Sequence, residues 1–421
     1  MKVIHLAASD SNGGAARAAY RVHLALTDTG INSQMWVLNR GTDNANVCNV
    51  NVSRLVRLKN KLSSLIIAKK LRDWHTNNNV LHSFGQVSAG IVNDLNATDA
   101  DIVNLHWIPG ILSIKDIGRI SKPVVWRFPD MWAFCGAEHY APDTPTSRFR
   151  VGYLMSNRAP DEKGTDINRI VWNEKRRLWR DQKFTIICTT HWLAKCTRES
   201  LLFANTKIHI IPNPLDVNEI WKPVDKQAAR IVLNLPLQKK LILMGTDWGL
   251  DSPYKGADLF IEAVRHLVSK DIDEFDLVIF GPNKPQKDLS FRGVTRFLGR
   301  IKDDRLLAML YSAVDIIVVP SRQEAFGQVA SEAQSCGTPV VAFDNSGIAD
   351  IVIHRETGWL AKAFNTEDLA YGISWIIENE KRHAYISEMA RRRAIERFSE
   401  SVIARKYIDV YQQVLESTRK K

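Results

Sequence analysis

The sequence predicts an α/β fold built from two doubly wound, Rossmann-like domains. In the first half, apolar strand-like runs alternate with helical patterns, starting with a strand at residues 2–8. A proline-containing segment at 212–225 interrupts this alternation, and the second half then restarts it. Helical patterns fill residues 366–397 and a last helix follows. We therefore expect an N-terminal domain at 1–215, a C-terminal domain at 216–398 and a final helix at 399–421.

Composition limits the class of protein. The 421 residues suit two or three domains, and no apolar run is long enough to cross a bilayer. The net charge of +11 favours anionic partners such as nucleotides, lipid head groups, lipid diphosphates or nucleic acid. The five cysteines form no CxxC pair, which favours a reducing, cytoplasmic setting without a structural metal. The polar residues that follow the first strand argue against a signal peptide.

One stretch, PSRQEAFGQVASEAQSCGTPVVAFDN at residues 320–345, carries the densest chemical signal. It follows the apolar run 315–319 and reads as strand, loop, helix and return strand. This is the geometry of a nucleotide site at the carboxyl edge of a parallel sheet. Free amides at the helix start, near Phe326, Gly327 and Gln328, can hold a phosphate. Glu324 and Glu332, eight residues apart, can accept hydrogen bonds from sugar hydroxyls.

The first domain offers a second set of strand-end residues. Gly13 and Gly14 follow the first strand, and small residues there let a ligand approach a helix start. An ordinary tight βα turn explains them equally well, and they do not match the GxGxxG fingerprint. Four further side chains follow later strands and should gather at the same edge: His106, Asp130, Glu138 and His139. The structural alternatives are a partly buried histidine at 106 whose hydrogen bonds are satisfied within the fold, and a helix cap at 130.

Two segments of the first half carry basic charge. Residues 54–72 form an amphipathic helix pattern with leucines at three- and four-residue steps and a basic side. Such a helix lies on an anionic bilayer or, more commonly, packs its apolar face on the sheet while its lysines are solvated. Residues 140–168 read as a long irregular excursion. Its arginines either meet an anionic acceptor or belong to a mobile surface loop.

In the second domain, Lys255 follows a strand-end loop at 246–254 and precedes Gly256 and a helix. A lysine there opposes the helix dipole, so a functional reason is worth seeking. Its point charge suits a diphosphate. Together with the helix start at Gly327, Lys255 would neutralise the negative charge that develops on a leaving diphosphate. A solvated lysine is the alternative.

These motifs together resemble the retaining glycosyltransferases of family 4, which have the GT-B fold. The resemblance rests on the E-x7-E pair and its block at 324–352, on the Lys255-Gly256 pair, on Gly13-Gly14 and on the turn at 358–360. It extends over the whole chain, and the HWIPG, DMWAF and GAEHY segments (106–110, 130–134 and 136–140) are similar to a bacterial subgroup that builds surface polysaccharides. It implies two domains facing a cleft, with helix 399–421 crossing back to the first.

The resemblance also implies roles. Glu324 and the amides near 326–328 would hold donor sugar and phosphate, Glu332 the ribose, and Lys255 the diphosphate, with Gly14 approaching from the first domain. The catalytic candidates are Glu324, Lys255 and Asp130, and those on the acceptor side are His106, Glu138 and His139. The leaving phosphate would help to deprotonate the acceptor, so the two glutamates are not a glycosidase pair. No cofactor or metal is expected.

Two departures from the family pattern stand out. Pro129 occupies the place of a histidine that often precedes the aspartate, so Asp130, His106 or His139 would have to replace it. The loop before Lys255 lacks the usual arginine, which leaves Lys255 and backbone amides, with Arg17 or Arg322, to neutralise the diphosphate.

The sequence therefore predicts a cytoplasmic enzyme that moves a sugar from a UDP- or GDP-type donor to a lipid-linked oligosaccharide in surface polysaccharide synthesis. The basic helix at 54–72 would contact the inner membrane surface. A sugar-nucleotide epimerase of the same fold would need a placed acid/base pair. A non-enzymatic anion or nucleic-acid binder would explain the charge but leave the two glutamates and the lysine unused. No RNA-binding motif is visible, so nucleic acid is not expected.

Overall fold

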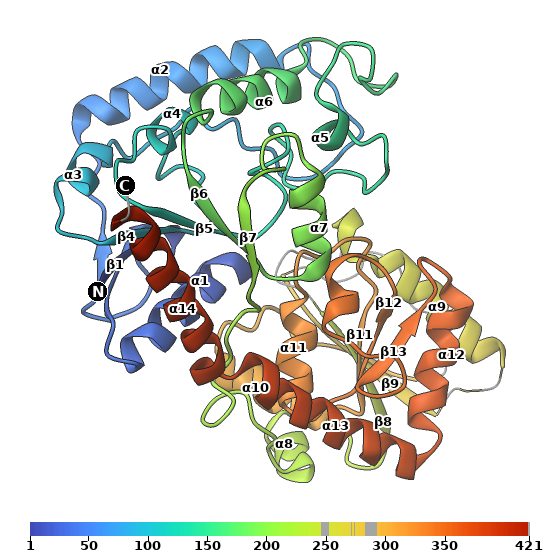
Figure 1. Ribbon diagram of the computed structural model, residues 1–421. Coiled ribbons are helices and arrows are strands. Elements are labelled where there is room, and N and C mark those ends of the chain that lie inside the picture. The colour runs from blue at the N-terminus through green and yellow to red at the C-terminus, as the bar shows by residue number, and fades with distance from the viewer. Residues whose placement is uncertain (246–251, 271, 273, 283–292, 420–421) are drawn as a thin grey trace. The chain divides into compact units, whose positions relative to one another are not determined.

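The computed structural model describes residues 1–245, 252–270, 272, 274–282 and 293–419. Most of the predicted loop at 246–254, namely 246–251, and the last two residues of the predicted helix 399–421 lie outside these ranges. The chain divides into two compact units, drawn in Figure 1. Unit 1 comprises Met1–Pro212 and Ile403–Lys421, and unit 2 comprises Asn213–Val402.

Unit 1 contains a seven-stranded parallel sheet in the order β3-β2-β1-β4-β5-β6-β7. Its strands are β1 Lys2–Ser9, β2 Asn32–Asn39, β3 Val47–Asn49, β4 Ile102–Leu105, β5 Val124–Phe128, β6 Phe184–Cys188 and β7 Lys207–Ile210. Its helices are α1 Gly14–Asp28, α2 Arg54–Leu71, α3 Val92–Ala97, α4 Ile114–Ile117, α5 Arg148–Val151, α6 Ile167–Leu178 and α7 His191–Glu199. The helix α14, Glu400–Arg419, belongs to unit 1 from Ile403 onward.

Both faces of this sheet are buried, which explains why its central strands are apolar throughout. On one face, side chains of α1 and α14 join Val3, Val125 and Ile187 in one apolar cluster. On the other, Trp126 and Phe128 of β5 pack edge-to-face against aromatic rings from later elements. The C-terminal helix is tied to the sheet by Tyr411, whose hydroxyl donates to Oδ1 of Asn104 at 2.8 Å.

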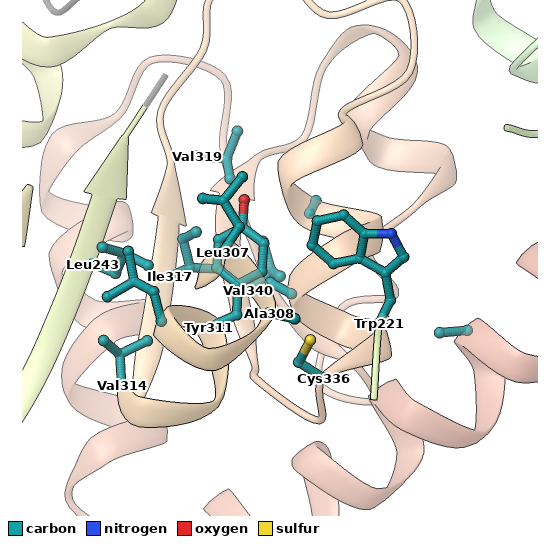
Figure 2. Packing of buried hydrophobic residues seen from close by; sticks show 14 of the residues in the cluster. Trp221, Leu243, Leu307, Ala308, Tyr311, Val314, Ile317, Val319, Cys336 and Val340 are labelled. Atoms are coloured by element: carbon teal, nitrogen blue, oxygen red, sulfur yellow. The ribbon is translucent and has the colours of Figure 1, made fainter. Parts of the chain in front are cut away.

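Unit 2 contains a six-stranded parallel sheet in the order β10-β9-β8-β11-β12-β13. Its strands are β8 Lys240–Gly245, β9 Phe275–Phe280, β10 Thr295–Phe297, β11 Ile316–Val319, β12 Val340–Phe343 and β13 Gly358–Ala361. Its helices are α8 Lys226–Val232, η1 Pro253–Lys255, α9 Ala257–Ser269, α10 Asp304–Ala313, α11 Gln328–Ser335, η2 Ser346–Asp350, α12 Thr366–Ile377 and α13 Glu380–Phe398. Figure 2 shows one of its two cores, where Tyr311 packs among aliphatic side chains.

In both sheets the chain starts in the middle, builds outward in one direction and then returns to build in the other. The reversal falls between β1 and β4 in unit 1 and between β8 and β11 in unit 2. Open sheets of this kind bind ligands outside the strand ends at such a reversal point. The predicted fold class, two doubly wound parallel sheets, is confirmed.

The helix predicted at 54–72 is present as α2, but its environment contradicts the more common of the two predicted arrangements. None of its residues is buried, and its leucines face solvent instead of packing on the sheet. Residues 140–168 are irregular apart from α5 and the start of α6, as predicted.

Candidate functional site

In unit 2, the predicted lysine and glutamate meet at the reversal point of the sheet. Lys255 follows β8 and Glu324 follows β11, and these two strands are neighbours. The Nζ atom of Lys255 donates to Oε1 of Glu324 at 2.6 Å. The hydroxyl of Ser321 donates to the same oxygen at 2.8 Å. Both charged side chains keep some contact with solvent, so a ligand at the strand ends can reach them.

Two glycines shape the backbone around this pair. Gly256 has a φ of 65°, and a Cβ there would lie 2.0 Å from the carbonyl oxygen of Pro320. Only glycine permits this close approach, which brings the loop carrying Lys255 next to the loop carrying Glu324. Gly327, with a φ of 93°, caps the start of α11 without a side-chain hydrogen bond. The first amides of α11 are therefore left to bind an anion.

The remaining donor-side candidates differ in accessibility. Phe326 is buried and its ring packs on Phe398 at 5.9 Å, so only its backbone can reach a ligand. Nε2 of Gln328 is buried without a hydrogen-bond partner among the described residues. Glu332 is only 4% exposed and its Oε2 accepts from the Tyr311 hydroxyl at 3.3 Å. The structure thus places Glu332 deeper in unit 2 than Glu324.

Arg322, a candidate for diphosphate neutralisation, is already engaged in unit 2. Its two terminal nitrogens donate to both carboxylate oxygens of Asp258 at 2.8 and 2.6 Å. The Arg322 hydrogen bond lowers the pKa of Asp258 and stabilises its ionised form. Lys255 is therefore the cation that directly adjoins Glu324.

In unit 1, Asp130 and His139 form a pair at the strand-end edge. Nδ1 of His139 lies 2.6 Å from Oδ2 of Asp130, and Nε2 lies 2.8 Å from Oγ of Ser83. A carboxylate only accepts hydrogen bonds, so Nδ1 of His139 is protonated and donates a hydrogen bond to Asp130. In the neutral ring, Nε2 then accepts from the hydroxyl of Ser83. Asp130 also accepts from the Trp132 amide at 2.9 Å, so it caps a turn and not the predicted helix, since residues 131–137 form turns and bends.

A pocket opens beside this pair. Its walls are mainly aromatic and include Trp107, Trp126 and Trp132, with Asp130, His139 and His106 supplying polar groups. The imidazole of His139 stacks near the Trp132 ring at 6.2 Å. The pocket has an empty volume of about 210 Å³, below the roughly 300–1,000 Å³ of drug-sized ligand sites, so it has room for a small group such as part of one sugar.

His106 lies in a buried group of three histidines. Its Nε2 is 2.9 Å from Nδ1 of His5 and 2.9 Å from Nδ2 of Asn104. The ring of His5 in turn meets that of His23 edge-to-face at 5.8 Å. Burial lowers the pKa of all three, that of His23 to about 4, so the cluster is neutral at pH 7. The predicted alternative, a buried histidine with satisfied hydrogen bonds, holds only in part. Nε2 of His106 is hydrogen-bonded, but its buried Nδ1 has no partner among the described residues, and the ring also lines the pocket.

Glu138 also belongs to a buried network. The Tyr153 hydroxyl donates to Oε1 of Glu138, and burial raises the pKa of this carboxyl. Nearby, the ammonium of Lys175 donates to the carbonyls of Trp132, Cys135 and Gly136, and burial lowers its pKa to about 7. These contacts hold the loop that follows Asp130 in one conformation.

In the turn at Gly13 and Gly14, the backbone conformation of Gly13 favours glycine, whereas the surrounding space would admit a side chain. Gly13 has a φ of 85°, and a Cβ there would meet no atom within 4 Å. Asp10 anchors the loop before it by accepting from the amides of Gly41 and Thr42 at 2.7 and 3.0 Å. The space around Gly13 is consistent with both predicted explanations, a ligand approach and a tight βα turn.

Arginines in the excursion at 140–168 pair within unit 1. Arg148 donates to Asp166, Arg150 to Asp143 and Glu199, and Arg158 to backbone carbonyls. These ion pairs order the segment and occupy the guanidinium groups that were candidates for an anionic acceptor.

Sequence patterns did not reveal several residues of these sites. Ser83, Tyr153 and Lys175 stand in no motif, and each meets its partner through tertiary contacts. Ser321 lies in the 320–345 stretch, but its local hydrogen bond to Glu324 was not predicted. Within the ranges that the structure describes, three or more His, Cys, Asp or Glu side chains nowhere gather in a way that could hold a metal ion.

The fold and the strand-end sites define a class. Two solved structures share the architecture over nearly the whole chain at low identity, which shows the fold alone. The HepE protein of Anabaena, solved with UDP-glucose, has a TM-score of 0.63 at 18% identity and covers all of both chains. WaaG, described as a glycosyltransferase involved in lipopolysaccharide biosynthesis, has a TM-score of 0.66 at 17% identity, covering 97% of this chain and 99% of WaaG. The fold is therefore GT-B.

Within this class, residues 225–393, which lie in unit 2, match the family described as glycosyl transferases group 1. A curated relative, D-inositol 3-phosphate glycosyltransferase 2 of Catenulispora acidiphila, is 32% identical over 214 residues, which are 47% of this chain and 49% of the relative. The chain thus spans about half the length of the curated relatives it matches. The Lys255–Glu324 pair and the start of α11 lie inside the matched segment.

Proposed function

We propose that this protein is a retaining glycosyltransferase that transfers a sugar from a nucleotide sugar to a lipid-linked oligosaccharide acceptor. The observation that carries the proposal is the Lys255–Glu324 pair beside the uncapped start of α11, inside the segment that matches the family. This arrangement joins a cation, free amides and an accepting carboxylate at one sheet edge. A sugar diphosphate presents the complementary groups: negative charge next to hydroxyl donors.

On the donor side, each group has a separate task. Lys255 and the amides at the start of α11 bind the diphosphate and stabilise its charge as the glycosidic bond breaks. Glu324 accepts hydrogen bonds from the sugar hydroxyls, while Glu332 receives the ribose. Because lysine and helix amides supply the neutralising charge, we propose a reaction that needs no metal or cofactor. The UDP-glucose bound to HepE supports a UDP-type donor, with GDP as the alternative.

On the acceptor side, Asp130 and His139 are the proposed contacts in unit 1. The carboxylate holds the ring so that Nε2 faces a hydroxyl donor, at present that of Ser83. An acceptor hydroxyl that replaces Ser83 would be oriented in the same way. The leaving phosphate takes up the proton of the acceptor hydroxyl. We propose that neither glutamate acts as a nucleophile and that the sugar keeps its anomeric configuration. The cleft between the two domains and the approach of Gly14 stay predictions.

For the acceptor we propose a lipid-linked oligosaccharide of a bacterial surface polysaccharide, with the enzyme peripheral on the inner face of the cytoplasmic membrane. The description of WaaG supports this class of acceptor. The names of the curated relatives point to D-inositol 3-phosphate as the alternative. No nucleic acid is proposed as a partner.

Ligand-induced stabilisation tests the donor assignment. We expect one UDP- or GDP-sugar in a panel to raise Tm, because a ligand that binds the native state stabilises it. The same sugar nucleotide should leave the Tm of Glu324→Gln almost unchanged. A panel in which no nucleotide sugar raises Tm, or in which the variant responds like the wild type, contradicts the assignment. Sugar transfer to extracted lipid acceptors and to D-inositol 3-phosphate then identifies the acceptor.

A sugar-nucleotide epimerase is the second candidate, and the Asp130–His139 pair favours it. This pair supplies the acid/base group that epimerisation requires and that the sequence alone does not reveal. The two functions differ in their products. An epimerase converts the donor without releasing the nucleoside diphosphate, whereas a transferase releases it in step with acceptor glycosylation.

A further inference from the structure

The helix α2 has an apolar face that the rest of the protein leaves uncovered. Leu55 is 80% exposed, and Leu58, Leu62, Leu65 and Ile66 are each 55–61% exposed. No residue of the helix is buried. Projected at about 100° per residue, these five side chains fall in one stripe about 100° wide. A stripe of large exposed side chains on one helix marks an interaction surface.

The rotation of α2 about its axis is set by contacts on its other side. Nδ2 of Asn60 donates to the carbonyl of Ser88 at 2.7 Å, and Oδ1 accepts from the Ser88 amide at 3.3 Å. Val56 lies against Gly90, where an added Cβ would come within 2.7 Å of it. This inward face is about 150° from the apolar stripe by the same projection. The stripe therefore points away from unit 1.

Charge on α2 identifies the partner that fits this surface. Residues 54–72 contain seven lysines and arginines and no acidic residue. By the same projection, four of these cations flank the stripe on one side and two on the other, and one lies within it at its C-terminal end: Arg54, Arg57, Lys61 and Arg72; Lys59 and Lys70; and Lys69. An apolar stripe bordered by cations complements a surface with an apolar interior and an anionic boundary. A second copy that docked through the same face would bring these cations close to their own counterparts, and the chain carries a net charge of +11.

We infer that α2 is an interfacial helix that inserts its leucine stripe into an anionic lipid bilayer, parallel to the membrane plane. The leucines enter the boundary between head groups and acyl chains, while the lysines and arginines extend to the lipid phosphates. No helix of the described chain is long and apolar enough to cross a membrane, so α2 lies on the bilayer. This inference deepens the proposed function by giving the lipid-linked acceptor a docking surface, but the binding itself requires neither donor nor acceptor.

Co-sedimentation with vesicles of phosphatidylcholine, with and without phosphatidylglycerol, tests the inference on the full chain. We expect binding to the phosphatidylglycerol vesicles. The pair Leu62→Gln and Ile66→Gln should weaken this binding by about tenfold or more, because two buried apolar side chains are lost. Ile231→Gln with Val232→Gln is the matched control, since both side chains are 66% exposed on α8 in unit 2. The control pair should bind like the wild type.

A second set of variants separates charge from apolar insertion. Changing Lys69, Lys70 and Arg72 to Glu should abolish the preference for anionic lipid, whereas Lys381→Glu with Arg392→Glu on α13 should leave it intact. All these side chains lie at the surface, so an unchanged Tm shows that each variant is folded. Wild-type binding that survives the Leu62 and Ile66 changes overturns the inference. The inference is also overturned if the wild type does not bind vesicles and light scattering shows a dimer that dissociates when Leu62 and Ile66 are changed to glutamine.

Failure of this inference and failure of the proposed function give different results. If the enzyme transfers sugar to a detergent-dispersed acceptor but no protein sediments with vesicles, only the membrane inference fails. If vesicle binding follows the pattern above and no nucleotide sugar is ever consumed, only the proposed function fails.

Discussion

The ammonium of Lys255 lies 2.6 Å from a carboxylate oxygen of Glu324, although 69 residues separate the two in the chain. The pair sits where neighbouring strands β8 and β11 end, at the reversal point of the unit 2 sheet. Each residue sets the environment of the other: the lysine orients the carboxylate and the carboxylate holds the lysine at the sheet edge. Four predictions follow from this pair, its glycine and the polar groups of unit 1.

Replacing Glu324 by glutamine should reduce sugar transfer by at least about a hundredfold, because the site loses a charged acceptor that strengthens its hydrogen bonds in the transition state. Steady-state kinetics with the donor found in the ligand panel measures the loss. Glu388→Gln, a surface change on α13, serves as the control and should transfer at the wild-type rate. Near-normal transfer by the Glu324 variant would reject its role at the donor.

Alanine at position 256 should destabilise unit 2 strongly. Its Cβ would lie 2.0 Å from the Pro320 carbonyl oxygen, in addition to the strain of a positive φ. Gly299→Ala is a close control, because Gly299 has a similar φ of 69° but open space around the Cβ position. Gly299→Ala should lower the free energy of unfolding by about 1 kcal/mol, and Gly256→Ala should lower it by clearly more. Equal losses in urea unfolding would show that the contact with Pro320 does not matter.

Asparagine at position 130 should lower kcat by about tenfold or more, since it no longer fixes the proton on Nδ1 of His139. The amide oxygen can still accept from Trp132, so the fold should survive and Tm should change little. Ser83→Ala removes the hydroxyl from the other side of the ring and should affect kcat less. If Asp130→Asn raises KM alone, the pair binds the acceptor without orienting its hydroxyl.

Unit 1 should lose stability in mild acid because of its buried histidines. The pKa of His5, His23 and His106 is lowered in the folded state from 6.5, that of His23 to about 4. Between these values the unfolded chain binds protons that the folded chain does not, so stability is fully present above pH 6.5 and falls as the pH drops. Each histidine contributes up to about 1.4 kcal/mol per pH unit.

Urea unfolding at several pH values measures this dependence. His23→Asn removes one of the three groups and should make the decline between about pH 6.5 and about pH 4 shallower by one histidine's share. His191, at the surface on α7, provides the control, and His191→Asn should leave the slope unchanged. A slope that His23→Asn does not alter would show that this histidine titrates alike in the folded and unfolded chains.

Much of the fold could be predicted because local patterns encode it. Strand and helix periodicity places most of the elements, and the block at 320–345 indicates the strand before Glu324 and the helix that carries Glu332. The same local rules place His106, Asp130 and His139 at one sheet edge, because parallel strands end together. These rules do not predict contacts such as that between Ser83 and His139, because 56 residues separate the two in the chain.

Local patterns in the chain were enough to predict the two α/β units, the lysine and glutamates of the donor-side candidate site, and a helix at 54–72 with one apolar and one basic side. Which side of that helix is covered depends on contacts with residues far away in the chain. Periodicity defines an apolar stripe but not its neighbours, and here Val56 and Asn60 take the inward contacts while the leucines stay exposed. Tertiary contacts likewise place His106 against the buried His5, at the wall of the pocket that Asp130 and His139 also line.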